Sequence, residues 1–146
     1  MSKLTVLFVC TGNTCRSSMA EVLFRDILKK EEIDWIEVKS AGVSAYEGQK
    51  ASPQAVEVMK RRGLDLSFHR ASQLNSELIR KADLILTMTE SHKNMVKLID
   101  PSAFDKTFTL KEYVGEDSID IMDPFGQSVE VYSHCAREIE GAEEIG

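Results

Sequence analysis

The residue types best suited to chemistry lie together in one short segment, CTGNTCRS at positions 10–17. Cys10 and Arg16 are separated by five residues, and a loop of that length can curl so that successive backbone N–H groups form a nest for an anion. Arg16 adds a planar guanidinium that can bind two phosphoryl oxygens at once. Gly12 is predicted to supply the positive φ of such a loop, and Asn13 to hold its curl by side-chain hydrogen bonds or to adopt the left-handed conformation itself. The segment therefore predicts a site for one phosphoryl group.

Cys10 is the candidate nucleophile of this site. A helix that begins near Arg16 places its positive end beside the thiol, and this field together with the guanidinium favours the reactive thiolate. The hydroxyl of Ser17 can donate a hydrogen bond to the sulfur and ease its departure in a second step. Phosphoryl transfer also requires a proton for the leaving group. Asp123 in MDPFG is the best candidate for that general acid, because Pro124 rigidifies its turn.

These residues need a buried strand before them and a helix after them. Residues 4–9 form a continuous apolar run rich in β-branched side chains, which is typical of a strand buried on both faces of a parallel sheet. From residue 16 to residue 30, apolar residues recur at helical spacing with charged residues between them. A loop between such a strand and helix lies at the carboxyl edge of the sheet, where open α/β folds bind ligands.

The rest of the chain continues this alternation of strands and helices. Periodicity and turn residues predict strands at 35–38, 83–88 and 107–110, helices at 53–62, 76–81, 90–99 and 129–140, and loops at 43–52 and 115–128. We therefore expect an α/β fold in a single domain over residues 1–146. Its open four-stranded parallel sheet should have helices on both faces and the phosphate-binding loop after the first strand.

Composition and charge exclude several functional classes. The chain has 146 residues, of which 42% are hydrophobic, and a formal net charge of −6. Nucleic-acid binding requires clustered Lys and Arg, so no nucleic-acid partner is expected. No run approaches the roughly 20 apolar residues of a membrane helix, and the first residues lack a signal-peptide cleavage site. We expect a cytoplasmic monomer with no membrane partner.

The cysteines and histidines do not indicate a metal site. Cys10, Cys15 and Cys135 are too few for a disulfide framework, and no Cys/His grouping has zinc spacing. Any cysteine chemistry is therefore expected to be reactive rather than structural. The three histidines occur singly and are interpreted as surface residues: His69, His92 and His134. Trp35 is interpreted as a core residue.

The segment VLFVCTGNTCRSSMAE resembles the signature of the low-molecular-weight protein tyrosine phosphatases, in which a strand precedes C-x-G-N-x-C-R-S and a helix follows it. SAG at 40–42, DLILTMT at 83–89 and DP at 123–124 match other family segments in order and approximate position. The resemblance covers nearly the whole chain. It implies a phosphatase domain that acts on phosphorylated proteins without a metal or cofactor and binds phosphate or other oxyanions in the loop. It also implies a role for three residues: nucleophile for Cys10, phosphate clamp for Arg16 and general acid for Asp123.

The same resemblance implies roles for the other loop residues. Asn13 and Ser17 would support the loop, and Cys15 would form a protective disulfide with Cys10 on oxidation. Ser18 stands where the family usually has proline. The serine should cost the start of the helix some rigidity, but it removes no catalytic group. The residues expected to bind substrate are Thr11, Gly12, Asn13, Thr14, Cys15, Ser17 and Phe125.

Departures from the tyrosine phosphatases favour phosphoarginine as substrate. Those enzymes usually carry a bulky aliphatic residue where this chain has Thr14, whose hydroxyl suits a polar guanidino group. They tend to follow the DP pair with two tyrosines, whereas this chain has Phe125 and Gly126. CTGNTCRS, together with FTLKEYV at 108–114 and DPFG at 123–126, resembles the protein-arginine phosphatase branch of the family. The prediction is hydrolysis of phosphoarginine in proteins through a cysteinyl-phosphate intermediate.

Other activities are weighed against this prediction. Tyr46 could stack on a phosphotyrosine ring, which keeps a tyrosine phosphatase open as the alternative. Thiol-dependent arsenate reductases share the fold and a similar loop, but they use a further cysteine pair where this chain has TMTESHKNMVK at 87–97. A non-enzymatic phosphate-binding module would explain the nest without explaining the cysteine.

Overall fold

Four parallel strands form the centre of the protein. A computed structural model describes residues 3–115 and 120–145. The strands lie in the order β2-β1-β3-β4, and Val9 on β1 pairs with both Ala41 and Thr87. All carboxyl ends therefore meet at one edge, which confirms the predicted open parallel sheet. The strand bounds are β1 (Leu4–Cys10), β2 (Ile36–Gly42), β3 (Leu84–Thr87) and β4 (Thr107–Thr109).

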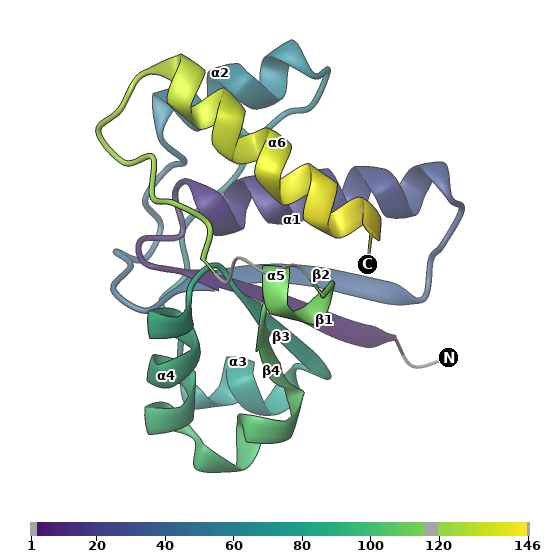
Figure 1. Ribbon diagram of the computed structural model, residues 1–146, viewed down its shortest axis with the longest axis vertical. Helices are drawn as coiled ribbons and strands as arrows, with labels where there is room; N and C mark the ends of the chain where they lie inside the picture. The colour runs from purple at the N-terminus through teal and green to yellow at the C-terminus, as the bar shows by residue number, and fades with distance from the viewer. Residues whose placement is uncertain (1–2, 116–119, 146) are drawn as a thin grey trace.

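Helices cover both faces of this sheet (Figure 1). One face carries α1 (Arg16–Lys30), α2 (Pro53–Arg61) and α6 (Val129–Ile145), and the other carries α3 (Ser76–Lys81), α4 (Glu90–Ile99) and the 3-10 helix η1 (Pro101–Lys106). Because side chains alternate along a strand, β1 contributes to two cores. Phe8 is fully buried in the α1 core, and Val9 is fully buried in the α3 and α4 core.

Several boundaries differ from the sequence prediction for local reasons. β2 continues through the SAG segment to Gly42, because β1 pairs with it along its whole length. β4 ends at Thr109, which begins a capping box with Glu112 and so starts the short helix α5 (Leu110–Tyr113). α6 continues past the predicted end at residue 140 to Ile145. Within the predicted loop at 115–128, residues 116–119 lie outside the described residues.

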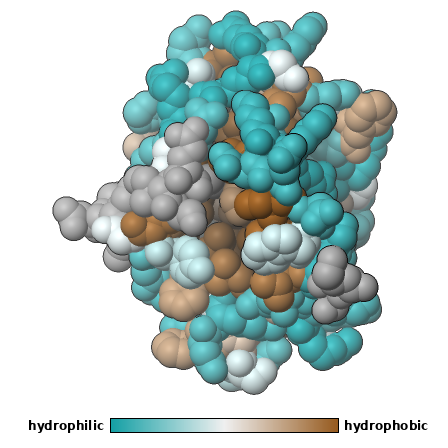
Figure 2. All heavy atoms as spheres, turned by 90° about the vertical axis from the view of Figure 1, so that its right-hand side faces the viewer, coloured by the Kyte–Doolittle hydropathy of each residue, from teal (hydrophilic) through white to brown (hydrophobic). Residues whose placement is uncertain are grey.

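Apolar side chains gather in a hollow at the amino ends of the strands, opposite the loop edge (Figure 2). Trp35 lines this hollow and is 47% exposed, so its predicted place in the core is wrong. It precedes β2, at the rim rather than between the layers. Among the helices of residues 3–115 and 120–145, none is long and apolar enough to cross a membrane.

Candidate active site

Asn13 fixes the loop between β1 and α1. Its φ of 59° is left-handed, and its side chain is fully buried. The amide Nδ2 donates to Ser17 Oγ and Ser40 Oγ, both at 2.8 Å, and Oδ1 accepts from the backbone N of Ser72 at 2.9 Å. Gly12, in contrast, does not have a positive φ, so its predicted role as the bend is wrong. Three hydrogen bonds of the asparagine side chain, rather than the conformational freedom of a glycine, hold the curl, because these bonds offset the strain of the left-handed backbone.

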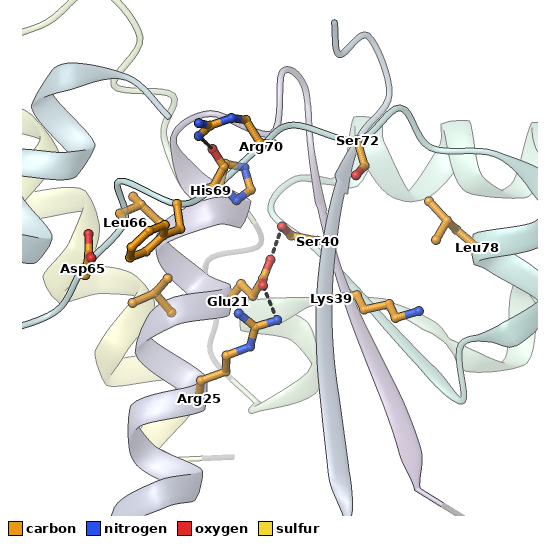
Figure 3. A pocket seen from close by; sticks show the side chains of 12 residues that line it. Glu21, Arg25, Lys39, Ser40, Asp65, Leu66, His69, Arg70, Ser72 and Leu78 are labelled. Atoms are coloured by element: carbon orange, nitrogen blue, oxygen red, sulfur yellow. Dashed lines mark hydrogen bonds and ion pairs between the residues drawn. The ribbon is translucent and has the colours of Figure 1, made fainter. Parts of the chain in front are cut away.

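A network of polar side chains connects the loop to β2 and α1, and Figure 3 shows three of its members, Ser40, Glu21 and Arg25. Ser40 on β2 donates to Glu21 Oε1 at 2.5 Å, and Glu21 in turn pairs with Arg25 on α1. His69 lies 2.6 Å from the carbonyl oxygen of Asn13 through its Nε2. A carbonyl can only accept, so this nitrogen carries the proton. His69 is therefore a contact of the loop, and its predicted purely surface role is wrong.

The Cys10 thiol sits at the base of the loop, 2% exposed. Its Sγ lies 2.9 Å from Ser17 Oγ and accepts from the backbone N of Asn13 at 3.3 Å. Because Ser17 Oγ already accepts from the Asn13 amide, its own proton can point at the sulfur or at the carbonyl oxygen of Ala41, which lies 3.5 Å away. A Ser17 proton directed at the sulfur gives Cys10 two hydrogen-bond donors, one from a side chain and one from the backbone.

Arg16 presents an unpaired donor to the loop. The residue is 4% exposed, and its Nη1 donates to the carbonyl of Ile121 at 2.9 Å. Its Nη2 lies 3.5 Å from Thr11 Oγ1 and 3.6 Å from Asp123 Oδ2, whereas Nε has no hydrogen-bond partner within the described part of the chain. A buried unpaired guanidinium donor is costly unless a ligand satisfies it. At the start of α1, Cys15 makes no side-chain capping bond with any described residue, so the geometry suits an oxyanion.

A cavity of about 270 Å³ opens above this loop. Asn13 and Ser17 lie beneath it as loop supports, while every other residue predicted for the site lines it. Sequence reasoning missed Ser44 and Gln49, which line the cavity from the segment after β2 and belong to no motif. The lining residues are Cys10, Thr11, Gly12, Thr14, Cys15, Arg16, Ser44, Tyr46, Gln49, Asp123 and Phe125.

Asp123 stands at the mouth of the cavity. Its side chain is half-exposed, with Oδ2 toward Arg16, and its Oδ1 accepts from the backbone N of Phe125 at 3.0 Å. Asp120, the other aspartate of this segment, instead accepts from the backbone N of Glu90 at 2.8 Å, at the start of α4. Asp123 is thus the aspartate placed to meet a group bound in the loop.

The other two cysteines differ in their surroundings. Cys15 Sγ lies 3.2 Å from the hydroxyl of Tyr132, and burial together with this contact raises the pKa of Tyr132 to about 12. Burial also raises the pKa of Cys135 to about 12, which keeps that thiol protonated and unreactive. All three cysteines are free thiols. No group of three or more His, Cys, Asp or Glu residues within 3–115 and 120–145 could hold a metal.

His92 is a buried contact of the loop rather than a surface residue, so that prediction is wrong. It is 4% exposed, and its Nε2 lies 2.9 Å from Thr11 Oγ1. Burial and, next, the Arg16 guanidinium lower the pKa of His92 from 6.5 to about 4. The imidazole is therefore neutral at physiological pH.

Gly42→Ala is expected to displace the loop. A Cβ at this position would lie 2.4 Å from the carbonyl oxygen of Thr11 and 2.9 Å from the backbone N of Asn13. Backbone cannot swing aside as a side chain can, so we expect a loss of about 1–3 kcal/mol of stability and of roughly 100-fold in kcat/KM for a phosphorylated substrate. Gly63→Ala is the matched control, since its φ of +76° disfavours alanine without any contact to the loop. Equal kinetic losses in both variants would contradict this reading of Gly42.

Comparison with known proteins agrees with this geometry. The family model described as low molecular weight phosphotyrosine protein phosphatase matches residues 5–144. A protein-arginine-phosphatase of Geobacillus stearothermophilus is 49% identical, covering 92% of this chain and 88% of its own. A probable low molecular weight protein-tyrosine-phosphatase of Ralstonia nicotianae is 38% identical, and the alignment covers 93% of this chain and 88% of the relative. The solved structure of an arginine phosphatase variant with a phosphorylated active-site serine superimposes with a TM-score of 0.93 at 42% identity. The superposition covers 97% of this chain and 92% of that one. The chain belongs to the low molecular weight phosphotyrosine protein phosphatase family.

Proposed function

We propose that the protein hydrolyses phosphoarginine in proteins through a cysteinyl-phosphate intermediate. The observation that carries the proposal is that one loop holds both Cys10 Sγ, which accepts from the backbone N of Asn13 and lies 2.9 Å from Ser17 Oγ, and the unpaired buried Nε of Arg16. Both surround one phosphoryl-sized space at the start of a helix. Phosphorylated proteins are the partners of this site, and residues 1–146 act as its single domain.

The first step transfers the phosphoryl group to sulfur. The Cys10 thiolate attacks phosphorus, so that an S–P bond forms while the P–N bond to the guanidino group breaks. Arg16 and the N–H groups of the loop stabilise the charge on the three equatorial oxygens. Asp123 donates its proton to the departing nitrogen, which leaves as a neutral arginine guanidine that then takes a proton from solvent.

The second step releases phosphate. Asp123, now a carboxylate, removes a proton from a water molecule that attacks phosphorus. The S–P bond breaks, and the thiolate of Cys10 leaves with the Ser17 hydroxyl 2.9 Å away to stabilise it. Each group has then returned to its starting protonation state, and no cofactor takes part.

Thr14 supports phosphoarginine over phosphotyrosine as substrate. It is 7% exposed and lines the cavity, so its hydroxyl offers a polar contact where an aliphatic side chain would offer a wall for a ring. The carboxyl group of Asp123, at the mouth of the cavity, offers an oxygen that can accept a hydrogen bond from a guanidino N–H and a proton for the departing nitrogen. The relative with 49% identity is named a protein-arginine-phosphatase. Phosphotyrosine is the second candidate, because Tyr46 lines the same cavity and is 79% exposed.

Thr14→Ile tests the substrate preference. We expect the wild-type chain to hydrolyse a phosphoarginine peptide with a higher kcat/KM than a phosphotyrosine peptide of otherwise identical sequence. The variant should lose roughly 10- to 100-fold for phosphoarginine, because a buried polar contact with the substrate disappears, and should retain or improve activity on phosphotyrosine. Thr5→Ile, on β1 and away from the cavity, is the control. Preference of the wild-type chain for phosphotyrosine would refute the arginine assignment.

We also infer that Cys15 protects the nucleophile from irreversible oxidation. Peroxide oxidises Cys10 to a sulfenic acid, and attack by the sulfur of the Cys15 thiol then forms a disulfide, with the hydroxyl group of the sulfenic acid and the thiol proton leaving as water. Wild type treated with peroxide should regain activity with dithiothreitol, whereas Cys15→Ala should regain much less because its sulfenic acid oxidises further. Cys135→Ala is the control. Equal recovery of Cys15→Ala and wild type would rule out this role.

A further inference from the structure

A chain of three hydrogen-bonding side chains reaches the loop from α4. Thr89, the N-cap residue of α4, accepts from the backbone N of His92 at 3.2 Å, and its Oγ1 lies 3.0 Å from His92 Nδ1. On the other side of the ring, Nε2 lies 2.9 Å from Thr11 Oγ1. Thr11 lines the active-site cavity, and its Oγ1 also accepts from Arg16 Nη2 at 3.5 Å. The imidazole thus joins the start of a helix to the phosphoryl site.

The hydrogen bonds that join Thr89, His92 and Thr11 allow two arrangements of their protons. Because the ring is neutral, one nitrogen donates and the other accepts. If Nε2 carries the proton, it donates to Thr11 Oγ1, Thr89 donates to Nδ1, and the Thr11 hydroxyl proton stays free. If Nδ1 carries the proton, Thr11 must spend its own proton on Nε2, and its oxygen then presents only lone pairs to the cavity.

A phosphoryl anion discriminates between these arrangements. Its oxygens only accept hydrogen bonds, so a Thr11 oxygen without a free proton would repel them, whereas a free hydroxyl proton would bind them. We propose that His92 is a positioning residue whose Nε2–H tautomer, held by Thr89, directs the hydroxyl proton of Thr11 into the active site as an additional donor to the phosphoryl group. This inference rests on the proposed function, since it concerns the same phosphoryl site.

The tautomer can be observed without turnover. We expect the nitrogen-15 chemical shifts of His92, measured on the wild-type chain saturated with inorganic phosphate at neutral pH, to show a protonated Nε2 and an unprotonated Nδ1. His134, which is exposed on α6, provides a reference for an unconstrained ring. A protonated Nδ1 in the phosphate complex would overturn the proposal. If the chain hydrolyses neither phosphopeptide, the proposed function fails, but this measurement still decides the role of His92 in binding phosphate.

Kinetic coupling tests whether His92 acts through Thr11. An asparagine at 92 reaches only toward Thr89, whereas the longer glutamine can place its amide N–H near the position of Nε2. We expect His92→Asn to lower kcat/KM for the phosphoarginine peptide by roughly 10-fold or more, as does Thr11→Val, and His92→Gln to restore most of the loss. The double variant Thr11→Val/His92→Asn should be no slower than Thr11→Val alone.

A merely structural His92 would give a different pattern. The two losses in kcat/KM would then multiply in the double variant, and His92→Gln would lose as much kcat/KM as His92→Asn. Either result would overturn the proposal. His134→Asn controls for the loss of a histidine elsewhere and should match wild type. Near-ultraviolet circular dichroism establishes which variants are folded, and the tautomer measurement stands on the wild-type chain if a His92 variant is not.

Discussion

Cys10→Ser is expected to abolish turnover while leaving phosphate bound in the loop. The substitution removes the thiolate but keeps a small polar group beneath the nest, and Arg16 with the helix N-terminus remains in place. Since a serine hydroxyl is a much weaker nucleophile than a thiolate and a poorer leaving group in the second step, kcat should fall by about four orders of magnitude or more. Single-turnover hydrolysis of a phosphoarginine peptide measures the loss, and calorimetric titration with inorganic phosphate measures binding.

The control for this experiment is Cys135→Ser. That cysteine is also buried but is close to the carbonyl of Met122 rather than to the loop, so its replacement should leave kcat within the range of wild type. Substantial hydrolysis by Cys10→Ser would exclude a cysteinyl-phosphate route. Loss of phosphate binding in the folded variant would instead mean that the thiol, not the nest, holds the anion.

Arg16→Lys is the second substitution with a large expected effect. Lysine keeps the positive charge but cannot bond the Ile121 carbonyl and two phosphoryl oxygens together, because it lacks the planar fork of arginine. We expect kcat/KM for the phosphoarginine peptide to fall by roughly 100- to 1,000-fold. Arg61→Lys, which changes an exposed ion pair with Glu57 on α2, should show no such loss.

The comparison of Arg16→Lys with Arg16→Met separates charge from geometry. If the guanidinium fork is what matters, both variants should be strongly impaired and their inhibition by inorganic phosphate should weaken together. Wild-type kinetics in Arg16→Lys would show that a point charge suffices, contrary to the role argued from the unpaired Nε.

Local sequence was sufficient to predict the order of elements and most of the site. The apolar run before Cys10 and the helical periodicity after Arg16 determine a strand–loop–helix unit, and its position at the carboxyl edge follows from parallel pairing. Cys10, Arg16 and Ser17 are close in sequence, so their convergence needed no knowledge of the tertiary structure. Asp123 is far from them in the chain, so its turn chemistry made it only a candidate, and the family resemblance added the support that local sequence lacked.

The contacts that sequence could not predict join segments far apart in the chain. His92 meets Thr11 across 81 positions, and His69 meets Asn13 across 56. A single histidine with no periodic or motif partner is indistinguishable in sequence from a surface residue until the fold brings its neighbour to it. The same reason hid Gly42, because only the pairing of β2 with β1 places its missing Cβ against the loop backbone.

The predicted positive φ of Gly12 and the predicted end of α6 are wrong for a different reason, whereas the alternative of a left-handed Asn13 is confirmed. Glycine is the usual choice for a positive φ, yet Asn13 takes it because Ser17, Ser40 and Ser72 satisfy its amide. Gly141, although a weak helix former, does not end α6, which runs through it to Ile145. In both places tertiary partners decided the outcome against local propensity.

The most direct test of the proposed reaction is to identify the phosphorylated atom during turnover. A phosphoarginine peptide carrying a labelled phosphoryl group is mixed with the enzyme, quenched with denaturant at neutral pH within one turnover, and the enzyme is digested and analysed by mass spectrometry. We expect a phosphoryl group on Cys10 that appears before free phosphate and then decays. Release of phosphate with no labelled Cys10 at any time, or no transfer from the phosphoarginine peptide at all, would contradict it.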